Sequence, residues 1–508
     1  MKIQRLYFQI LVLSIFSTQS CFTLAAENDE VFDIVISNGR VLDPETNLDA
    51  IRDIGIIDGS IAEISVESLA AKLVANGELI EANGLVVSPG FIDMHAHGQS
   101  QTSANYLIHD GVTTALELEG GVYPVREWLA VRENQRPINF GTSIAQGDAR
   151  SLAQFAASDR RELEAAYRSS VENLGVFSAQ YGELLRDSNY SELSLDQYAV
   201  MREELLKGIR DGAIGIGLAH GYTPGATEQE IFDVFEFTAE HNSMIFTHVR
   251  ESGISAMQEV ISNSILTDAA LHIVHVNSMA LGDIDFVLGM ISSARQRGFN
   301  ISTEVYPYTA ASTGLGSALF DEGWKEEMGG IDFNDLQWVG TGERLNAETF
   351  RSYRETGGTV IIHMMEEDWI ERALSEPFVM VASDGMPFAP GAHPRSAGTF
   401  SRVLGRYVRE RGVLSLNDAI QKMTIMPAQR LEPVAPVMAK KGRLQESADA
   451  DITIFDADRI LDTATFEEGL SYSVGVEYVL VGGTVVIREG ELLEGVFPGK
   501  AILGAGLQ

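Results

Sequence analysis

The chain has 508 residues, of which 45% are hydrophobic and 21% charged, and its formal net charge is −35 at pH 7. This composition is typical of a globular protein and excludes a largely disordered chain. The negative charge disfavours binding to nucleic acid, whose phosphates need Lys and Arg, and to an anionic membrane surface. The length allows one large α/β barrel and a smaller domain.

The first 25 residues have the pattern of a signal peptide. Lys2 and Arg5 form a positive region, and the apolar stretch that follows at residues 6–16 is too short to span a bilayer. Small residues permit cleavage after Ala25, which would leave a mature chain without cysteine. We therefore expect export to the periplasm, with a lipid anchor on Cys21 as the alternative. No other apolar run is long enough to cross a membrane.

Both ends of the remaining chain predict β-structure. Residues 32–90 contain short runs of β-branched residues broken by Gly, Asn and Asp, a pattern typical of strands joined by turns. Residues 436–508 show the same pattern. We expect these two segments to assemble into one small β-sandwich, although they lie at opposite ends of the sequence.

The central residues, 91–435, alternate strand and helix patterns. A helix is predicted over 195–210, where Ser194 provides an N-cap. Repeated βα units imply parallel strands with right-handed crossovers, and about eight such units close into a (β/α)₈ barrel of the TIM type. The predicted strands include residues 114–116, 139–144, 213–218, 243–248, 271–275, 300–305 and 379–384.

Five residues at predicted strand ends indicate a metal site. His95 and His97 lie two residues apart in an extended segment, so their imidazoles face the same side. His248, His275 and Asp384 close later strands. The carboxyl ends of barrel strands converge on one face, and neutral imidazole is the commonest protein ligand of divalent transition metals. We therefore expect these five side chains to bind metal together.

The chain resembles the amidohydrolase superfamily and, within it, the N-acyl-D-amino-acid deacylases, also called D-aminoacylases. The Pro-Gly-Phe-Ile-Asp-Met-His-Ala-His run marks the superfamily, whereas a Tyr-Pro-Tyr-Thr-Ala segment and a His-Pro-Arg segment are more specific to the deacylases. The resemblance implies a metal-dependent hydrolase with one or two zinc ions, which releases a carboxylic acid and a D-amino acid from an N-acyl-D-amino acid. The matching stretches are residues 89–97, 111–114, 211–215, 222–225, 305–310, 383–385, 393–395, 398–400 and 402–407.

One departure from this family concerns the metal ligands. Its members usually carry a metal-bridging cysteine at the point where this chain has Glu117 and Glu119. Carboxylate oxygen is a competent zinc ligand, so we expect Glu119, or alternatively Glu117, to replace the thiolate. A glutamate that merely ends its strand is the other alternative. A bridging carboxylated lysine, as in other branches, is excluded because the only lysine between residues 140 and 250 is Lys207, in a predicted helix.

Asp384 is the expected catalytic residue. It can bind the metal and also act as general base, taking a proton from the attacking water and passing it to the departing amine.

Several residues are expected to contact the substrate. Arg250 is a natural clamp for a carboxylate. The resemblance adds Tyr306 and Tyr308 as groups that could hold the same carboxylate. Arg150 and Arg395 could either contact substrate or form structural ion pairs. Several arginines near the barrel mouth would suit an acidic side chain, such as that of D-glutamate.

Two other functions remain open at this point. One is a different amidohydrolase activity, on a cyclic amide, a dipeptide or a formamide. The other is an exported binding protein that has lost its chemistry, which the retained histidines and Asp384 argue against. The oligomeric state is left open.

Overall fold

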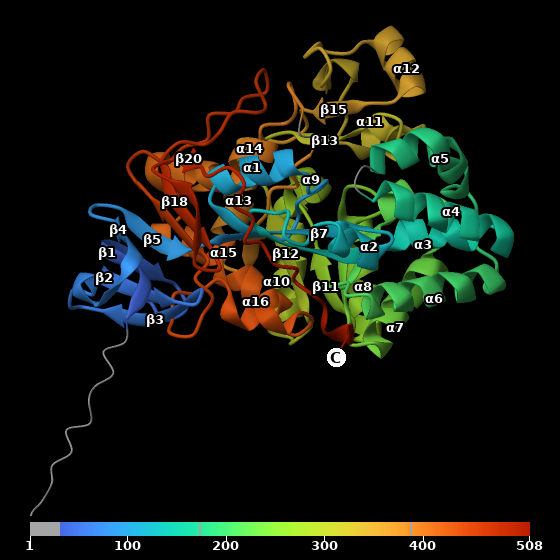
Figure 1. The fold of residues 1–508 in the computed structure, drawn as a ribbon. Coiled ribbons are helices and arrows are strands. Elements are labelled where there is room, and N and C mark those ends of the chain that lie inside the picture. Colours follow the sequence, from blue (N-terminus) through green and yellow to red (C-terminus); the bar gives the residue numbers. More distant parts are fainter. Residues whose placement is uncertain (1–30, 172–173, 387–388, 508) are drawn as a thin grey trace, which may run out of the picture.

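The computed structural model describes residues 31–171, 174–386 and 389–507 (Figure 1). The predicted signal peptide and Cys21 lie outside the described residues. In the part of the chain that is described, no helix combines the length and the apolarity that a bilayer crossing would need.

The centre of the molecule is a barrel of eight parallel strands, in the order β16-β12-β11-β10-β9-β8-β7-β6. Strands β6 and β16 are not joined by a regular ladder. Instead, the amide of Asp384 donates to the carbonyl of His95 at 2.8 Å, and the amide of Ser383 donates to Asp93 Oδ1 at 3.1 Å. These bonds close the ring at its carboxyl end, as the predicted (β/α)₈ fold requires. The strands are β6 (Phe91–Asp93), β7 (Val112–Val122), β8 (Asn139–Ala145), β9 (Ile216–Ala219), β10 (Met244–His248), β11 (Ala270–Ile273), β12 (Ile301–Val305) and β16 (Val379–Val381).

Helices surround the barrel and follow its strands in turn (Figure 1). The predicted helix is confirmed as α6, which begins after the N-cap residue Ser194. The Ser194 hydroxyl accepts from the Gln197 amide, and the Gln197 side chain accepts from the Ser194 amide. The helices are α1 (Gln101–His109), α2 (Val125–Ala130), α3 (Gln146–Ala153), α4 (Ala157–Ser170), α5 (Leu174–Ser188), α6 (Leu195–Arg210), α7 (Glu228–Glu240), α8 (Ile254–Thr267), α9 (Val276–Ala280), α10 (Ile284–Gln296), α13 (Glu367–Ser375), α14 (Arg395–Arg402), α15 (Leu416–Met423) and α16 (Ile425–Leu431).

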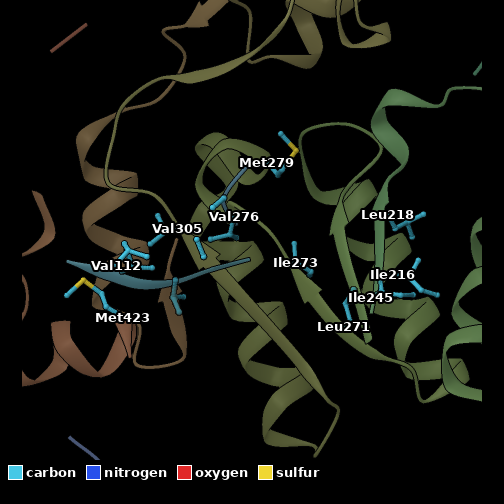
Figure 2. Packing of buried hydrophobic residues seen from close by; sticks show 14 of the residues in the cluster. Val112, Ile216, Leu218, Ile245, Leu271, Ile273, Val276, Met279, Val305 and Met423 are labelled. Atoms are coloured by element: carbon cyan, nitrogen blue, oxygen red, sulfur yellow. The ribbon is translucent and has the colours of Figure 1, made fainter. Parts of the chain in front are cut away.

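The main hydrophobic core joins these strands to the helices around them. Ile216, Ile245 and Leu271 are fully buried and occupy one row across β9, β10 and β11, as Figure 2 shows. Each such side chain contributes about 1.5–3 kcal/mol by leaving water. This packing holds neighbouring strand ends, and the residues on them, in register.

The two ends of the chain form one hydrogen-bonded sheet of nine strands, in which β17 pairs antiparallel with β5. The sheet also folds back on itself, because the amide of Ala450 donates to the carbonyl of Gly59 at 2.8 Å and the turn at Gly482 packs against Gly59. The expected assembly of the two terminal segments is therefore present. The strands are β1 (Phe32–Asp43), β2 (Leu48–Ile57), β3 (Ser60–Ser65), β4 (Leu73–Glu81), β5 (Val86–Pro89), β17 (Ile452–Phe455), β18 (Val476–Val481), β19 (Thr484–Arg488) and β20 (Glu491–Leu492).

The last residues leave this sheet and return to the barrel. The amide of Ile502 donates to the carbonyl of Phe140 at 2.7 Å, and that of Gly504 donates to Gly212 at 3.0 Å. The terminal segment thus covers β8 instead of extending the sheet, a course that the strand pattern did not indicate.

Residues 311–364, called the insertion below, form a separate small unit between β12 and α13. Its three strands make an antiparallel sheet in the order β13-β15-β14, and its own core contains Phe320, Trp324 and Phe350. It lies over the carboxyl ends of the barrel strands, at the top of Figure 1. The repeated βα pattern did not predict this unit. Its elements are β13 (Ala311–Gly314), α11 (Trp324–Glu327), β14 (Leu336–Trp338), α12 (Ala347–Thr356) and β15 (Thr359–Ile362).

Candidate metal centre and its cavity

All the residues expected to bind metal meet at the carboxyl end of the barrel. They come from five strands that are far apart in the sequence, and the barrel brings them together as predicted. They are His95 and His97 after β6, Glu119 in β7, His248 at the end of β10, His275 after β11 and Asp384 after β16.

A first group of donors surrounds one point. The Nε2 atoms of His95 and His97 are 3.1 Å apart, and each lies 3.5 Å from Asp384 Oδ1. Glu119 Oε2 lies 3.5 Å from His97 Nε2 and 3.8 Å from His95 Nε2. Four ligand atoms therefore face each other at similar separations.

A second group uses the other oxygen of the same glutamate. His248 Nδ1 is 3.0 Å from His275 Nε2, and Glu119 Oε1 lies 3.2 Å and 4.0 Å from these two nitrogens. Glu119 therefore lies between two pairs of imidazoles, one oxygen toward each pair. This is the position that a bridging ligand requires, and Glu117 does not occupy it.

The spacing of the donors fits a divalent metal. Two nitrogens bound to one tetrahedral zinc at about 2.0–2.1 Å lie roughly 3.3 Å apart. The two imidazole pairs, at 3.1 Å and 3.0 Å, match this spacing. Unprotonated nitrogens facing each other so closely would repel, unless a cation or a proton lies between them.

Two further glutamates orient the histidines. His95 Nδ1 lies 2.6 Å from Glu304 Oε1, and His97 Nδ1 lies 2.7 Å from Glu117 Oε1. The second oxygen of Glu304 lies 3.0 Å from His272 Nε2. Carboxylates in this position fix the ring and leave Nε2 for the metal. Sequence reasoning assigned neither role. The signals available were that Glu117 lies two residues before Glu119 on one strand, and that Glu304 lies near the end of another strand.

The charges at the centre also favour a cation. Burial would lower the pKa of an imidazole, but Asp384 and Glu304 raise the pKa of His95 to about 9. Burial would raise the pKa of a carboxyl, yet the neighbouring imidazoles lower the pKa of Glu119 to about 2. Likewise, the Arg395 guanidinium holds the pKa of the Asp384 carboxyl far below its usual range. The carboxylates stay ionised and attract positive charge, which a metal ion would supply.

Two of the ligand candidates have an unusual backbone. His275 and Asp384 follow their strands with φ of 31° and 50°, in the left-handed region that is costly for residues other than glycine. Such conformations concentrate at functional sites, where the surrounding structure enforces them. Here they turn both side chains back toward the centre of the barrel.

A cavity of about 390 Å³ opens directly on the centre. His97, Glu119 and Asp384 form part of its base, and residues of the insertion form the opposite wall. Among the residues expected to contact substrate, Arg250 and Tyr306 line this cavity. The buried hydroxyl of Tyr306 has no hydrogen-bond partner among the described residues.

The arginines are committed to carboxylates. Arg250 binds both oxygens of Glu259, at 3.2 Å and 2.9 Å. Arg395 Nη1 lies 2.8 Å from Asp384 Oδ2, beside the centre. Among the described residues at this site, these two arginines are therefore not free to bind an acidic substrate side chain in the way that the sequence had led us to expect.

Arg150 and Tyr308 lie elsewhere. Arg150 is fully buried and pairs with Glu230 at 2.8 Å. Of the two expected roles for Arg150, the structure therefore shows the structural ion pair. The Tyr308 hydroxyl donates to Asp462 at 3.3 Å. Neither residue is among those that line the cavity.

Comparison with known proteins agrees with this geometry. Two models described as "Amidohydrolase family" match residues 86–288 and 343–487, together well over half of the chain. The first segment contains five of the six candidate ligands, and the second contains the sixth, Asp384. The chain belongs to the amidohydrolase family.

Within the family, the chain is similar to enzymes that act on N-acylated D-amino acids. It is 28% identical to a D-aminoacylase of Alcaligenes xylosoxydans xylosoxydans over 495 residues, which cover 92% of this chain and 96% of that one. It is also 28% identical to an N-acyl-D-glutamate deacylase of the same organism, with 91% and 94% covered. A crystal structure of N-acyl-D-glutamate deacylase from Bordetella bronchiseptica, complexed with zinc and a phosphonate inhibitor, has the same fold: the TM-score is 0.77 at 24% identity, with 93% and 100% covered.

Proposed function

We propose that this protein is a zinc-dependent hydrolase of N-acyl-D-amino acids. The observation that carries the proposal is the position of Glu119 between two pairs of imidazoles at the base of a cavity. The similarity to D-aminoacylase and N-acyl-D-glutamate deacylase over more than nine-tenths of the chain names the substrate class.

The donors divide into two sets that share Glu119. His95, His97 and Asp384 would complete one set, and His248 and His275 the other. The second set leaves a position open, as catalytic zinc sites do. Bound zinc would lower the pKa of a water molecule and polarise the scissile carbonyl.

Asp384 is the base of the reaction. Its carboxylate takes a proton from the water that attacks the carbonyl carbon, and it then delivers this proton to the amide nitrogen. The C–N bond breaks, and a carboxylic acid and a D-amino acid leave. The Arg395 guanidinium keeps Asp384 ionised, which is the state that a general base needs before it takes the proton.

The substrate carboxylate has a suitable place beside this base. The Arg395 guanidinium lies over the Tyr306 ring, 4.6 Å from its centre, and the Tyr306 hydroxyl has no partner among the described residues. A substrate carboxylate that accepts from the Tyr306 hydroxyl would satisfy this hydroxyl and present the amide to the metal centre.

The first test is amine release from paired N-acetyl-D- and N-acetyl-L-amino acids by zinc-loaded protein. Release confined to the D-isomers supports the proposal. Hydrolysis of dihydropyrimidines, hydantoins, dipeptides or formamides alone, followed as formation of carboxylic acid, would assign a different amidohydrolase activity. No release from any of them, together with no stoichiometric zinc, would favour a binding protein.

A pair of variants tests the role of the bridging residue. Glu119→Ala should reduce both zinc content and activity, because it removes the ligand shared by the two donor sets. Glu322→Ala changes an exposed glutamate of the insertion that does not line the cavity, and it should retain both. Full zinc content in Glu119→Ala would contradict the bridging role.

We also propose export to the periplasm. The support is the positive and apolar pattern of the first 25 residues, with Cys21 as the alternative lipid anchor. The mass of the purified protein's N-terminal peptide would show cleavage after Ala25, lipid on Cys21, or an intact N-terminus that rules out both.

A further inference from the structure

The cavity is lined in part by apolar side chains, which come from the insertion and from the segments that follow β11 and β16. Unbranched methionine side chains predominate there, and Met279 and Met328 are each only 7% exposed. Such side chains adapt to a flexible chain without fixing its shape. The apolar lining residues are Met279, Leu319, Met328, Ile362, Met364 and Met386.

The mouth of the same cavity carries two carboxylates. Glu251 follows β10 and Glu327 ends α11 in the insertion, and both are exposed residues that line the cavity. Neither carboxylate group has an ion pair or hydrogen bond to another residue in the described part of the chain. Burial raises the pKa of Glu327, and the negative charges of Glu251, Asp321 and Glu326 add to this shift.

Basic side chains balance these carboxylates only in part. Arg250 is the sole Lys or Arg among the described residues that line the cavity; its charge acts on the neighbouring Glu251, but its hydrogen bonds go to Glu259 and to the carbonyl of Ala226. A ligand group placed between Glu251 and Glu327 therefore meets net negative charge.

Buried polar atoms without hydrogen-bond partners give this cavity groups that a polar ligand atom can bind. The hydroxyls of Tyr306 and Ser312 both line it, and neither has a hydrogen-bond partner among the described residues. Tyr306 is 1% exposed and Ser312 is 7% exposed. Leaving such groups unsatisfied costs about 1–3 kcal/mol each, so a polar ligand atom near the metal centre is expected to bind them. The apolar lining and the two mouth carboxylates are then left to contact the side chain of the ligand.

We propose that the preferred substrates carry a long aliphatic side chain that ends in a cation, as in N-acyl-D-lysine, N-acyl-D-ornithine and N-acyl-D-arginine. The aliphatic part would lie along the methionine wall and the cation between Glu251 and Glu327. Lysine and arginine side chains commonly combine a buried stem with a charged tip in water. This inference rests on the proposed function and specifies its substrate.

The test compares kcat/KM for N-acetyl-D-lysine and N-acetyl-D-norleucine, which share the aliphatic chain and differ in the terminal ammonium. Each exposed carboxylate contributes a factor of about 2 to 5, so the wild-type ratio should be roughly 4 to 25 at low salt and fall as salt is added. N-acetyl-D-glutamate should be the poorest of the three. A ratio near one in the wild type would overturn the inference.

Variants assign the preference to the two residues. Glu251→Gln and Glu327→Gln should each lower the lysine-to-norleucine ratio by about 2- to 5-fold, and the double variant should bring it near one. Glu322→Gln, on the same insertion but outside the cavity, should leave the ratio unchanged. Because the ratio is measured within one preparation, partial misfolding does not affect it. An unchanged ratio in the double variant would also overturn the inference.

The outcome is separable from that of the proposed function. Hydrolysis of N-acetyl-D-norleucine without preference for lysine leaves the deacylase activity standing and removes the cation site. Absence of hydrolysis for all D-substrates by zinc-loaded protein contradicts the proposed function itself.

Discussion

The barrel mouth and the insertion face the same cavity but are built differently. The mouth presents buried histidines and carboxylates whose positions follow from strand ends, and His95 and His97 are held by hydrogen bonds to Glu304 and Glu117. The insertion presents Met328, Met364 and the exposed Glu327 from a small unit with a core of its own. The barrel strand ends therefore supply the chemistry, whereas the insertion, together with Glu251 after β10, supplies the preference for one substrate over another.

The largest expected effect concerns the chemistry of the barrel mouth. Asp384→Asn removes the proton acceptor and keeps the shape of the side chain, so kcat should fall by about 10²–10⁴-fold. Amine release from the best D-substrate measures this, with zinc content and melting temperature measured on the same sample. A variant with near-wild-type kcat would exclude Asp384 as the base.

A change in the core of the insertion should separate the two regions. Trp324 is 6% exposed and stacks on Phe350 with ring centres 5.3 Å apart. Trp324→Ala should destabilise the insertion by about 3–5 kcal/mol and raise KM, because the apolar wall of the cavity depends on this core. Hydrogen exchange should increase in residues 311–364, whereas zinc content should not change. Loss of zinc would show that the two regions are not independent.

A smaller effect is expected from the residue behind His95. Glu304→Gln keeps the size of the side chain but weakens the interaction that orients the imidazole, at 2.6 Å in the structure. Losses of about 10- to 100-fold in metal affinity or activity are typical for such partners. Competition with a chelator gives the affinity. Equal affinities of variant and wild type would reduce Glu304 to a packing role.

The smallest predicted effect concerns His393, which lies beside the residue that precedes the insertion. Its Nε2 lies 2.9 Å from the Ala310 carbonyl, and its Nδ1 accepts from the Arg395 amide at 3.0 Å. Burial and the Arg395 charge hold the pKa of His393 well below its usual value. Below about pH 6.5 the unfolded chain therefore binds one proton more than the folded protein, and the free energy of unfolding decreases on acidification by about 1.4 kcal/mol per pH unit.

The matched variant is His393→Gln, which lacks the titrating group. Urea unfolding at pH 7.5, 6.0 and 5.0 should show a shallower decrease for the variant than for the wild type. Parallel decreases would mean that His393 does not contribute to the pH dependence.

Much of the metal centre was predictable because barrel geometry is regular. His248 ends an apolar strand and Asp384 follows one, so their convergence follows from the fold class alone. Arg150 shows the limit of this reasoning. Its partner Glu230 lies on α7, a different helix, and only the packing of the helices shows that the pair is buried and lies outside the cavity.

The amino-acid sequence by itself determined the barrel, the pairing of the terminal β-segments and the set of side chains at the strand ends, because these depend on local periodicity and on the identity of the residues. Tertiary structure alone decided which glutamate lies between the histidine pairs. Glu117 and Glu119 lie two residues apart on the same strand, β7. They differ in the side chains that face them: Glu117 contacts one histidine of the centre, His97, whereas Glu119 lies between the two histidine pairs. The cavity wall was likewise decided by tertiary structure, since the insertion folds around its own core and nothing local in its sequence indicates that it covers the metal centre.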